Sequence, residues 1–217
     1  MLAQVVLFDG FDPLDVIAPF EVLHAGGRYT DGALSVELVS AEGPREVPSG
    51  LAAVTLRASA TLDPARADLI VVPGAVGRIT EDGRGDTIPA ILGRTLQTDL
   101  PALLKEALDK PGLTVSTVCG GSTILAMAGL IEGRHATTHH LGLDLMDATG
   151  VIAVDARVVD DGNLVTGAGV TSGLDLALHL LDRHLGPRIA HAVEKLFAHE
   201  RRGTVWRAQG PVPAATY

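Results

Sequence analysis

The chain has 217 residues, of which 47% are hydrophobic and 20% are charged, and its net charge is −9 at pH 7. This composition predicts a globular protein with a sizeable core and excludes a disordered chain. The negative charge argues against nucleic acid as the main partner, because phosphate binding needs a concentrated basic surface. The single cysteine excludes an internal disulfide and a zinc site built from paired cysteines.

The apolar segments are too interrupted to cross a membrane. No run of about 18 apolar residues occurs, so we expect no transmembrane helix. The first residues, MLAQVVLFDGFDPLD, have no basic leader and no obvious cleavage site. We therefore expect no signal peptide and a cytoplasmic location.

The first two elements are a strand and a helix. Residues Ala3–Phe8 form a short apolar run typical of a strand buried on both faces. A helix follows, with Asp12 suited to the N-cap and Pro13 to the first helical position. Pro19 is expected to kink this helix, and Gly26–Gly27 to end it.

Further strands and helices alternate along the middle of the chain. Residues Leu34–Ala41 predict a second strand, and a small hairpin or an extended excursion is expected around Pro48–Gly50. A buried strand over Ala67–Gly74 ends abruptly at its proline and glycine. Residues 80–87 are loop-like and residues 88–110 are largely helical.

The last elements repeat this alternation. Residues 113–118 predict a strand and residues 122–130 a helix. Two short strands joined by a turn at Asp160–Asn163 come next. Two final helices follow, because Gly186 can stop the first and Pro187 can start the second.

This order of elements predicts a mostly parallel sheet with helices on both faces, in one domain over residues 1–217 with a short tail from about residue 200. Ligands of such sheets bind at the carboxyl ends of the strands. Three segments lie at such ends: Pro73–Gly74, Cys119, and the sequence TGAGVTSG over residues 166–173. We therefore expect a binding site there.

Cys119 lies between a strand and a helix and precedes two glycines. This arrangement is typical of a nucleophile elbow, in which a sharp turn lifts the side chain above the sheet. The start of the following helix would favour a thiolate and offer unpaired amides to a developing charge. The alternative is that Cys119 is a small buried hydrophobic residue, and spacing leaves both interpretations open.

A reactive thiol needs a partner that moves protons. Asp15, in the first turn of the first helix, is one candidate, but with Asp12 it also forms a pair like a capping box. His139 and His140 are two others. The pair His199–Glu200 resembles the His-x-Glu pair of glutaminase triads, but it lies in a predicted helix near the chain end and we discount it. Histidine and carboxylate spacing indicates no metal site.

Several motifs in order resemble those of the ThiJ/PfpI superfamily: LIVVPGA, VSTVCGGSTILAMAGLIEGRHATTHH and DGNLVTGAGVTSGLDLALHLL. The resemblance extends from about Val5 to about Phe197 and implies a flavodoxin-like three-layer α/β sandwich. The opening FDGFDPLDVIAPFEVL is similar to the isocyanide hydratase subgroup. The N-terminal domains of some AraC-type regulators share the same motifs.

The resemblance implies a role for each matching residue. Cys119 matches the nucleophile and Asp15 the acid that hydrogen-bonds the thiol and moves protons. Gly74 and Ala75 match the loop whose amides help to bind negative charge, Gly120 matches the residue after the nucleophile, and His139 matches a histidine near the cysteine. The chain departs from the subgroup twice: Gly120 stands in place of threonine, and Ala75 in place of the second glycine of Pro-Gly-Gly.

The implied activity is a cysteine-dependent hydration of small molecules, in which an isocyanide and water give an N-substituted formamide through a Cys119 thioimidate. No cofactor and no metal are implied, and a homodimer is expected. Two alternatives stay open: a non-enzymatic ligand-binding or redox-sensing module, and glyoxalase or deglycase activity. The peptidase branch has histidine directly after the cysteine, so Gly120 argues against peptidase activity.

Overall fold

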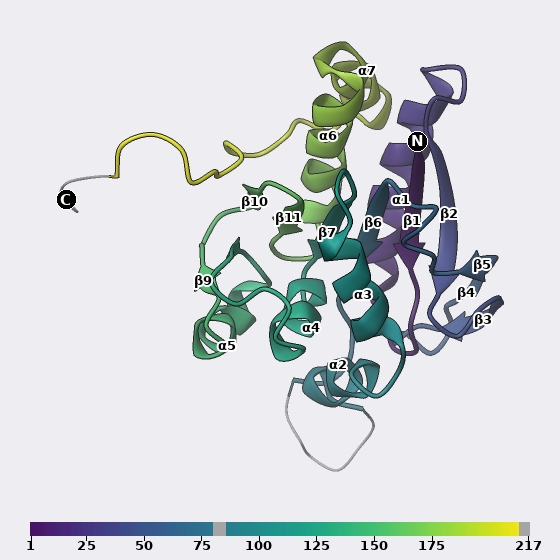
Figure 1. Ribbon diagram of the computed structural model, residues 1–217. Coiled ribbons are helices and arrows are strands. Elements are labelled where there is room, and N and C mark those ends of the chain that lie inside the picture. The colour runs from purple at the N-terminus through teal and green to yellow at the C-terminus, as the bar shows by residue number, and fades with distance from the viewer. Residues whose placement is uncertain (80–85, 213–217) are drawn as a thin grey trace.

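The computed structural model describes residues 1–79 and 86–212. A seven-stranded sheet forms its centre, in the order β10-β11-β7-β6-β1-β2-β5, and all neighbours are parallel except β10 and β11 (Figure 1). The strands of this sheet are β1 (Leu2–Val6), β2 (Ser35–Ser40), β5 (Ala60–Thr61), β6 (Leu69–Val72), β7 (Thr114–Val118), β10 (Val158–Asp161) and β11 (Leu164–Gly167). The predicted α/β sandwich is confirmed.

Helices cover both faces of the sheet. On one face α1, α6 and α7 pack against one another, and on the other α3 and α4 pack against β7 (Figure 1). The helices are α1 (Pro13–Arg28), α2 (Ile88–Thr95), α3 (Leu100–Asp109), α4 (Gly121–Met127), α5 (Leu143–Ala148), α6 (Ser172–Leu185) and α7 (Pro187–Phe197). No helix of the described residues is long and apolar enough to span a bilayer.

Two small sheets complete the structure. Strands β3 (Arg45–Pro48) and β4 (Thr55–Ala58) pair antiparallel and confirm the expected hairpin. Strands β8 (His135–Ala136) and β9 (Ile152–Ala153) pair in parallel and were not predicted. The predicted loop at residues 80–87 lies largely outside the described residues, and the predicted helical stretch 88–110 contains two helices, α2 and α3.

The sequence places the end of α1 too early. The helix continues through Gly26 and Gly27 to Arg28. These glycines are required by packing, because a Cβ at Gly26 would lie 2.3 Å from the Leu181 side chain of α6, and one at Gly27 would lie 2.1 Å from the Leu34 carbonyl oxygen. The two glycines therefore allow close packing inside the helix and do not mark its end.

The C-terminal tail is attached to the sheet edge over part of its length. The Asp160 amide donates to the Trp206 carbonyl at 2.9 Å, and the Trp206 amide donates to the Val158 carbonyl at 2.9 Å. The buried Asp160 carboxylate also contacts one histidine ring and two arginine guanidinium groups: His179 Nε2 at 2.8 Å, Arg183 Nη1 at 3.3 Å and Arg207 Nη2 at 3.1 Å. The tail therefore covers an edge strand with both main-chain and ionic contacts.

The Asp160→Asn variant is expected to lose about 2 to 3 kcal/mol of stability at pH 7, because the two arginines and the buried His179 ring lose the carboxylate that they contact. Burial acts to raise the pKa of Asp160, but the hydrogen bond from His179 and then the Gly162 amide and Arg183 lower it to about 2. A depressed carboxyl pKa stabilises the fold above its unfolded value of 3.8, and this stability is lost as pH falls through about 2.

Urea denaturation at pH 7 and between pH 2 and 5 measures both effects. Asp109→Asn is the matched control, because its ion pair with Lys105 is exposed and contributes little. Equal losses in the two variants would contradict the assigned role of Asp160.

Candidate active site

Cys119 occupies a strained turn at the carboxyl end of β7. Its φ is +54°, a left-handed conformation that non-glycine residues rarely adopt. Its amide donates to the carbonyls of Gly167 at 3.1 Å and Ala168 at 2.8 Å, and its carbonyl accepts from Thr138 Oγ1 at 2.8 Å. The end of β11 and the segment that follows β8 thus hold the turn, and the arrangement is that of a nucleophile elbow.

The two glycines after Cys119 have different roles. A Cβ at Gly121 would lie 2.2 Å from the Val72 carbonyl oxygen, so only glycine lets α4 start this close to β6. A Cβ at Gly120 would lie 3.3 Å from the flexible end of the Leu92 side chain and 3.7 Å, an ordinary contact distance, from the Gly74 Cα. Gly121 is therefore needed by the fold, whereas Gly120 keeps space open beside the thiol.

Asp15 lies in the first turn of α1 and is fully buried. Asp12 alone caps the helix, since its Oδ1 accepts from the Leu14 amide at 2.9 Å. Asp15 Oδ2 accepts instead from the Gly74 amide at 2.9 Å. The interpretation of Asp15 as half of a capping box is therefore wrong.

The expected oxyanion role of Gly74 needs correction. Its amide is committed to Asp15, and its carbonyl accepts from the Asp12 amide at 3.0 Å. Gly74 thus holds Asp15 in place rather than facing a substrate. Ala75 and Gly120 line the pocket beside Cys119, and the Ala75 amide donates to no group in the described part of the chain.

The Asp15 carboxyl holds a proton at neutral pH. Burial raises its pKa to about 8, the charge of Asp12 adds to this effect, and hydrogen bonds from the Gly74 amide and the Cys119 thiol oppose it. The other oxygen, Oδ1, is buried and accepts no hydrogen bond from the described residues that meets ordinary geometry. Asp15 is therefore a neutral acid next to the thiol, which is the state that a proton donor needs.

Cys119 is a thiol rather than the expected thiolate. Burial raises the pKa of the thiol, and Asp15 raises it further where its carboxyl is ionised. The Gly120 amide at the start of α4 lowers it, as the sequence predicts, but burial outweighs this effect. Activation of the sulfur therefore requires that its proton move as it attacks.

A pocket of about 340 Å³ opens over Cys119. Most of its lining is apolar, and in the described part of the chain no lysine or arginine faces it. The apolar side chains of the lining come from several segments of the chain: Ala75, Val76, Ile79, Ile88, Pro89, Leu92, Met127, Leu141, Leu145 and Val170. The pocket therefore suits a small uncharged ligand.

Two threonines in this pocket were missed by sequence reasoning. Thr123 and Thr138 both line it, and their hydroxyl oxygens lie 3.1 Å apart. Thr138 is part of the sequence HATTHH, but its link to the Cys119 carbonyl connects residues 19 positions apart. Only the folded chain brings these hydroxyls together.

The structure distinguishes the two candidate histidines. His139 lines the pocket, whereas His140 is exposed and does not. The Leu141 amide donates to His139 Nδ1 at 3.3 Å, and burial together with the neighbouring His140 lowers the His139 pKa. His139 is therefore a neutral imidazole whose proton lies on Nε2.

Other candidate groups lie elsewhere. His199 contacts Asp175 at 3.4 Å and is not part of the pocket at Cys119. No cluster of three or more His, Cys, Asp or Glu side chains among residues 1–79 and 86–212 could hold a metal ion.

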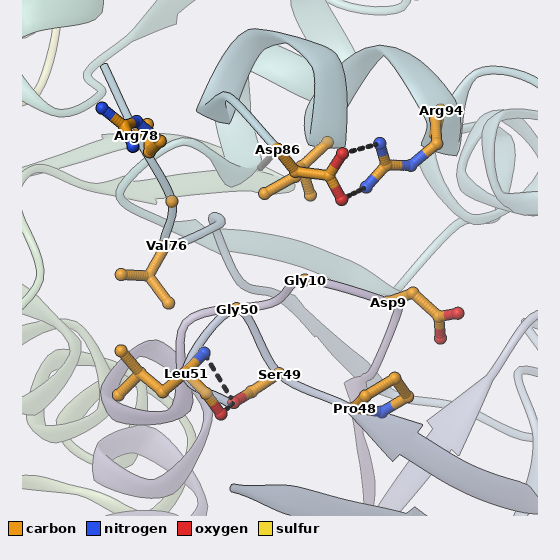
Figure 2. A pocket seen from close by; sticks show the side chains of 12 residues that line it. Asp9, Gly10, Pro48, Ser49, Gly50, Leu51, Val76, Arg78, Asp86 and Arg94 are labelled. Carbon is orange, nitrogen blue, oxygen red and sulfur yellow. Dashed lines mark hydrogen bonds and ion pairs between the residues drawn. The ribbon is translucent and has the colours of Figure 1, made fainter. Parts of the chain in front are cut away.

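A larger hollow, about 780 Å³, lies beside the turn at Ser49–Leu51 (Figure 2). Arg94 and Asp86 line it, and they form a two-point ion pair with each other at 3.0 and 2.7 Å. It does not include Cys119 or Asp15. The smaller pocket over the thiol is therefore the candidate active site.

The sheet order and the layers of helices are those of a known class of α/β proteins. Residues 1–183 match the DJ-1/PfpI family, and the chain belongs to it. Drosophila melanogaster DJ-1beta has the same fold, with a TM-score of 0.75 and 21% identity over 92% of this chain and 98% of that one.

Two curated relatives differ in what they do. Isonitrile hydratase of Pseudomonas putida is 33% identical over 192 residues, which cover 87% of this chain and 74% of that protein. The HTH-type transcriptional regulator CdhR of Pseudomonas aeruginosa is 26% identical over 197 residues. The match covers 88% of this chain but about half, 53%, of the regulator. The family thus includes enzymes and regulators, while the homodimer and the cytoplasmic location stay predictions.

Proposed function

We propose that this protein hydrates small, uncharged isocyanides to N-substituted formamides, with Cys119 as nucleophile and Asp15 as acid and base. The observation that carries the proposal is the pair itself: a buried thiol beside a carboxyl whose pKa is raised to about 8, at an apolar pocket. Isonitrile hydratase, at 33% identity, supports the same substrate class.

The first step adds the thiol to the isocyanide carbon. Asp15 donates its proton to that carbon while the sulfur bonds to it, and the thiol proton replaces the one that Asp15 gave. One S–H bond breaks and one C–S and one C–H bond form, which gives a thioimidate on Cys119. The sulfur need not exist as a free thiolate beforehand, which agrees with the raised pKa of Cys119.

The second step returns the enzyme to its first state. The oxygen of a water molecule bonds to the thioimidate carbon, and one water proton passes through Asp15 to the nitrogen. The C–S bond then breaks, and the remaining hydroxyl proton returns through Asp15 to the sulfur. Isocyanide and water have become a formamide, and both Cys119 and Asp15 regain their protons.

The test is formamide production from para-nitrophenyl isocyanide by the wild type and by Cys119→Ala. We expect turnover in the wild type and a loss of at least about 1,000-fold in the variant, because the covalent route is gone. Chromatography of the formamide product measures both. Absence of formamide with the wild-type protein would refute the proposed function.

The same preparations separate the alternatives. Consumption of methylglyoxal that depends on Cys119, without formamide production, would assign glyoxalase or deglycase activity. A rise in melting temperature with a ligand, without turnover of isocyanides, glyoxals or amides, would indicate a binding module. Cys119→Ser is the conservative companion variant in each assay, because it replaces only the sulfur atom, by oxygen.

A further inference from the structure

Thr123 and Thr138 form a short hydroxyl chain at the wall of the pocket. Thr123 is 5% exposed and Thr138 is 1% exposed, and both face the same pocket as Cys119. Thr138 Oγ1 lies 2.8 Å from the Cys119 carbonyl oxygen and 3.1 Å from Thr123 Oγ1. The chain thus begins at the nucleophile's own backbone and ends at Thr123.

The direction of each hydrogen bond follows from proton counting. A carbonyl oxygen only accepts, so Thr138 must donate its single hydroxyl proton to Cys119. Thr138 Oγ1 can then only accept from Thr123, which uses the single proton of Thr123. The Thr123 oxygen therefore offers lone pairs alone, and no other described group donates to it.

Hydration of a thioimidate needs such an acceptor. The attacking water carries two protons, of which one goes to the nitrogen through Asp15. The second proton must be held by a hydrogen bond while the water oxygen bonds to carbon. A water molecule whose second O–H group has no acceptor can rotate away from the line of attack. An oriented lone pair at the wall meets this need.

We propose that Thr123 is the positioning residue for the hydrolytic water, accepting the water proton that does not move to Asp15. This inference rests on the proposed hydration. Water oxygen bonds to the thioimidate carbon, one proton moves to nitrogen, and the proton held by Thr123 stays on the oxygen until the C–S bond breaks.

Other polar groups near the thiol are less suited to this role. Asp12 also lines the pocket, but it caps α1, where its Oδ1 accepts from the Leu14 amide. Gly120 has no side chain that could accept a proton. His139 Nδ1 already accepts from the Leu141 amide, and Nε2 carries a proton and so donates. Asp15 holds a proton until it has reacted.

The experiment follows the two steps separately in Thr123→Val and Thr123→Ser with para-nitrophenyl isocyanide. Rapid quenching and intact-mass spectrometry measure the Cys119 adduct, and chromatography measures formamide. In Thr123→Val we expect adduct formation at the wild-type rate and formamide release roughly 10- to 100-fold slower, since one oriented hydrogen bond is lost. The adduct should accumulate in Thr123→Val and not in Thr123→Ser.

Thr30→Val is the control for the loss of a threonine hydroxyl, because Thr30 Oγ1 is hydrogen-bonded within the protein, to backbone carbonyls at 2.9 and 3.1 Å, but lies outside the pocket. Wild-type formamide release by Thr123→Val, or equal slowing of both steps, would overturn the role of Thr123. If Thr123→Val does not fold, Thr123→Ala takes its place with the same expected split. A wild type that forms neither adduct nor formamide would overturn the proposed function, and this role with it.

Discussion

The Asp15→Asn variant is expected to be more stable than the wild type at neutral pH and to lose nearly all turnover. The asparagine side chain has almost the same shape, and its amide oxygen can still accept from the Gly74 amide. The substitution also replaces the carboxyl group, whose ionisation burial opposes, by an amide that does not ionise. Stability and activity should therefore move in opposite directions at this residue.

The sign of the stability effect follows from linkage. The pKa of Asp15 is about 8 in the folded state and 3.8 in the unfolded state. At any pH between these two values, the folded state keeps a proton on Asp15 that the unfolded state has released. Wild-type stability from this group is complete below about pH 4 and falls until the pH passes about 8. Asp15→Asn should match the wild type near pH 4 and exceed it by up to about 4 kcal/mol at pH 7.

Activity should depend on the same proton. In the wild type we expect kcat/KM for isocyanide to fall above about pH 8, where Asp15 loses the proton that it donates. Asp15→Asn cannot donate or accept that proton, and we expect a loss of roughly 100- to 10,000-fold. The pH profile of formamide production measures both effects.

Urea denaturation from pH 4 to 8.5 measures the stability difference, with Glu21→Gln as control. Glu21 is an exposed carboxylate on the same helix, so its replacement should change stability little at any pH. A stability difference for Asp15→Asn that does not grow with pH would contradict the raised pKa.

Gly121→Ala is expected to lose roughly 2 to 4 kcal/mol of stability, because its Cβ would collide with the main chain of β6. The built Cβ lies 2.2 Å from the Val72 carbonyl oxygen and 3.0 Å from that of Pro73. Main-chain atoms in a central strand cannot move without breaking sheet hydrogen bonds. We expect the turn at Cys119 to be distorted, so that enzymatic activity is lost together with stability.

Gly120→Ala is the matched control for this prediction. The φ at Gly120 is −68°, which alanine adopts readily, and the nearest atom to its Cβ is the flexible end of Leu92 at 3.3 Å. We expect a loss of less than about 1 kcal/mol. Urea midpoints of the two variants give the comparison, and similar losses would refute the distinction between the two glycines.

The sequence predicts well what depends on local pattern. Apolar runs such as Ala3–Phe8 and residues 113–118 predict buried strands because both faces of a parallel sheet are covered. Gly186 and Pro187 separate the last two helices as expected, and Gly186 has a φ of +89°. The elbow at Cys119 also follows from its neighbours, since a strand, a small residue and a helix start are adjacent in the chain.

Contacts between distant residues decide the rest. The pair Gly26–Gly27 is locally indistinguishable from a glycine signal that ends a helix. Only the packing of α1 against Leu181 and Leu34 explains why glycine occupies these two positions inside the helix. Part of the tail beyond residue 200 pairs with β10, because Asp160 gathers partners from α6 and from the tail. No local pattern contains these contacts.

By itself, the sequence determined the alternating α/β order, the cysteine at the strand–helix boundary and the position of Asp15, because these depend on residues that are neighbours in the chain. Tertiary structure decided what those residues are chemically. Asp15 meets Gly74 across 59 positions of the chain, and burial rather than the helix end sets the protonation of Asp15 and Cys119. Burial depends on how all the layers pack around the site, so the charge state of the pair is a property of the whole fold.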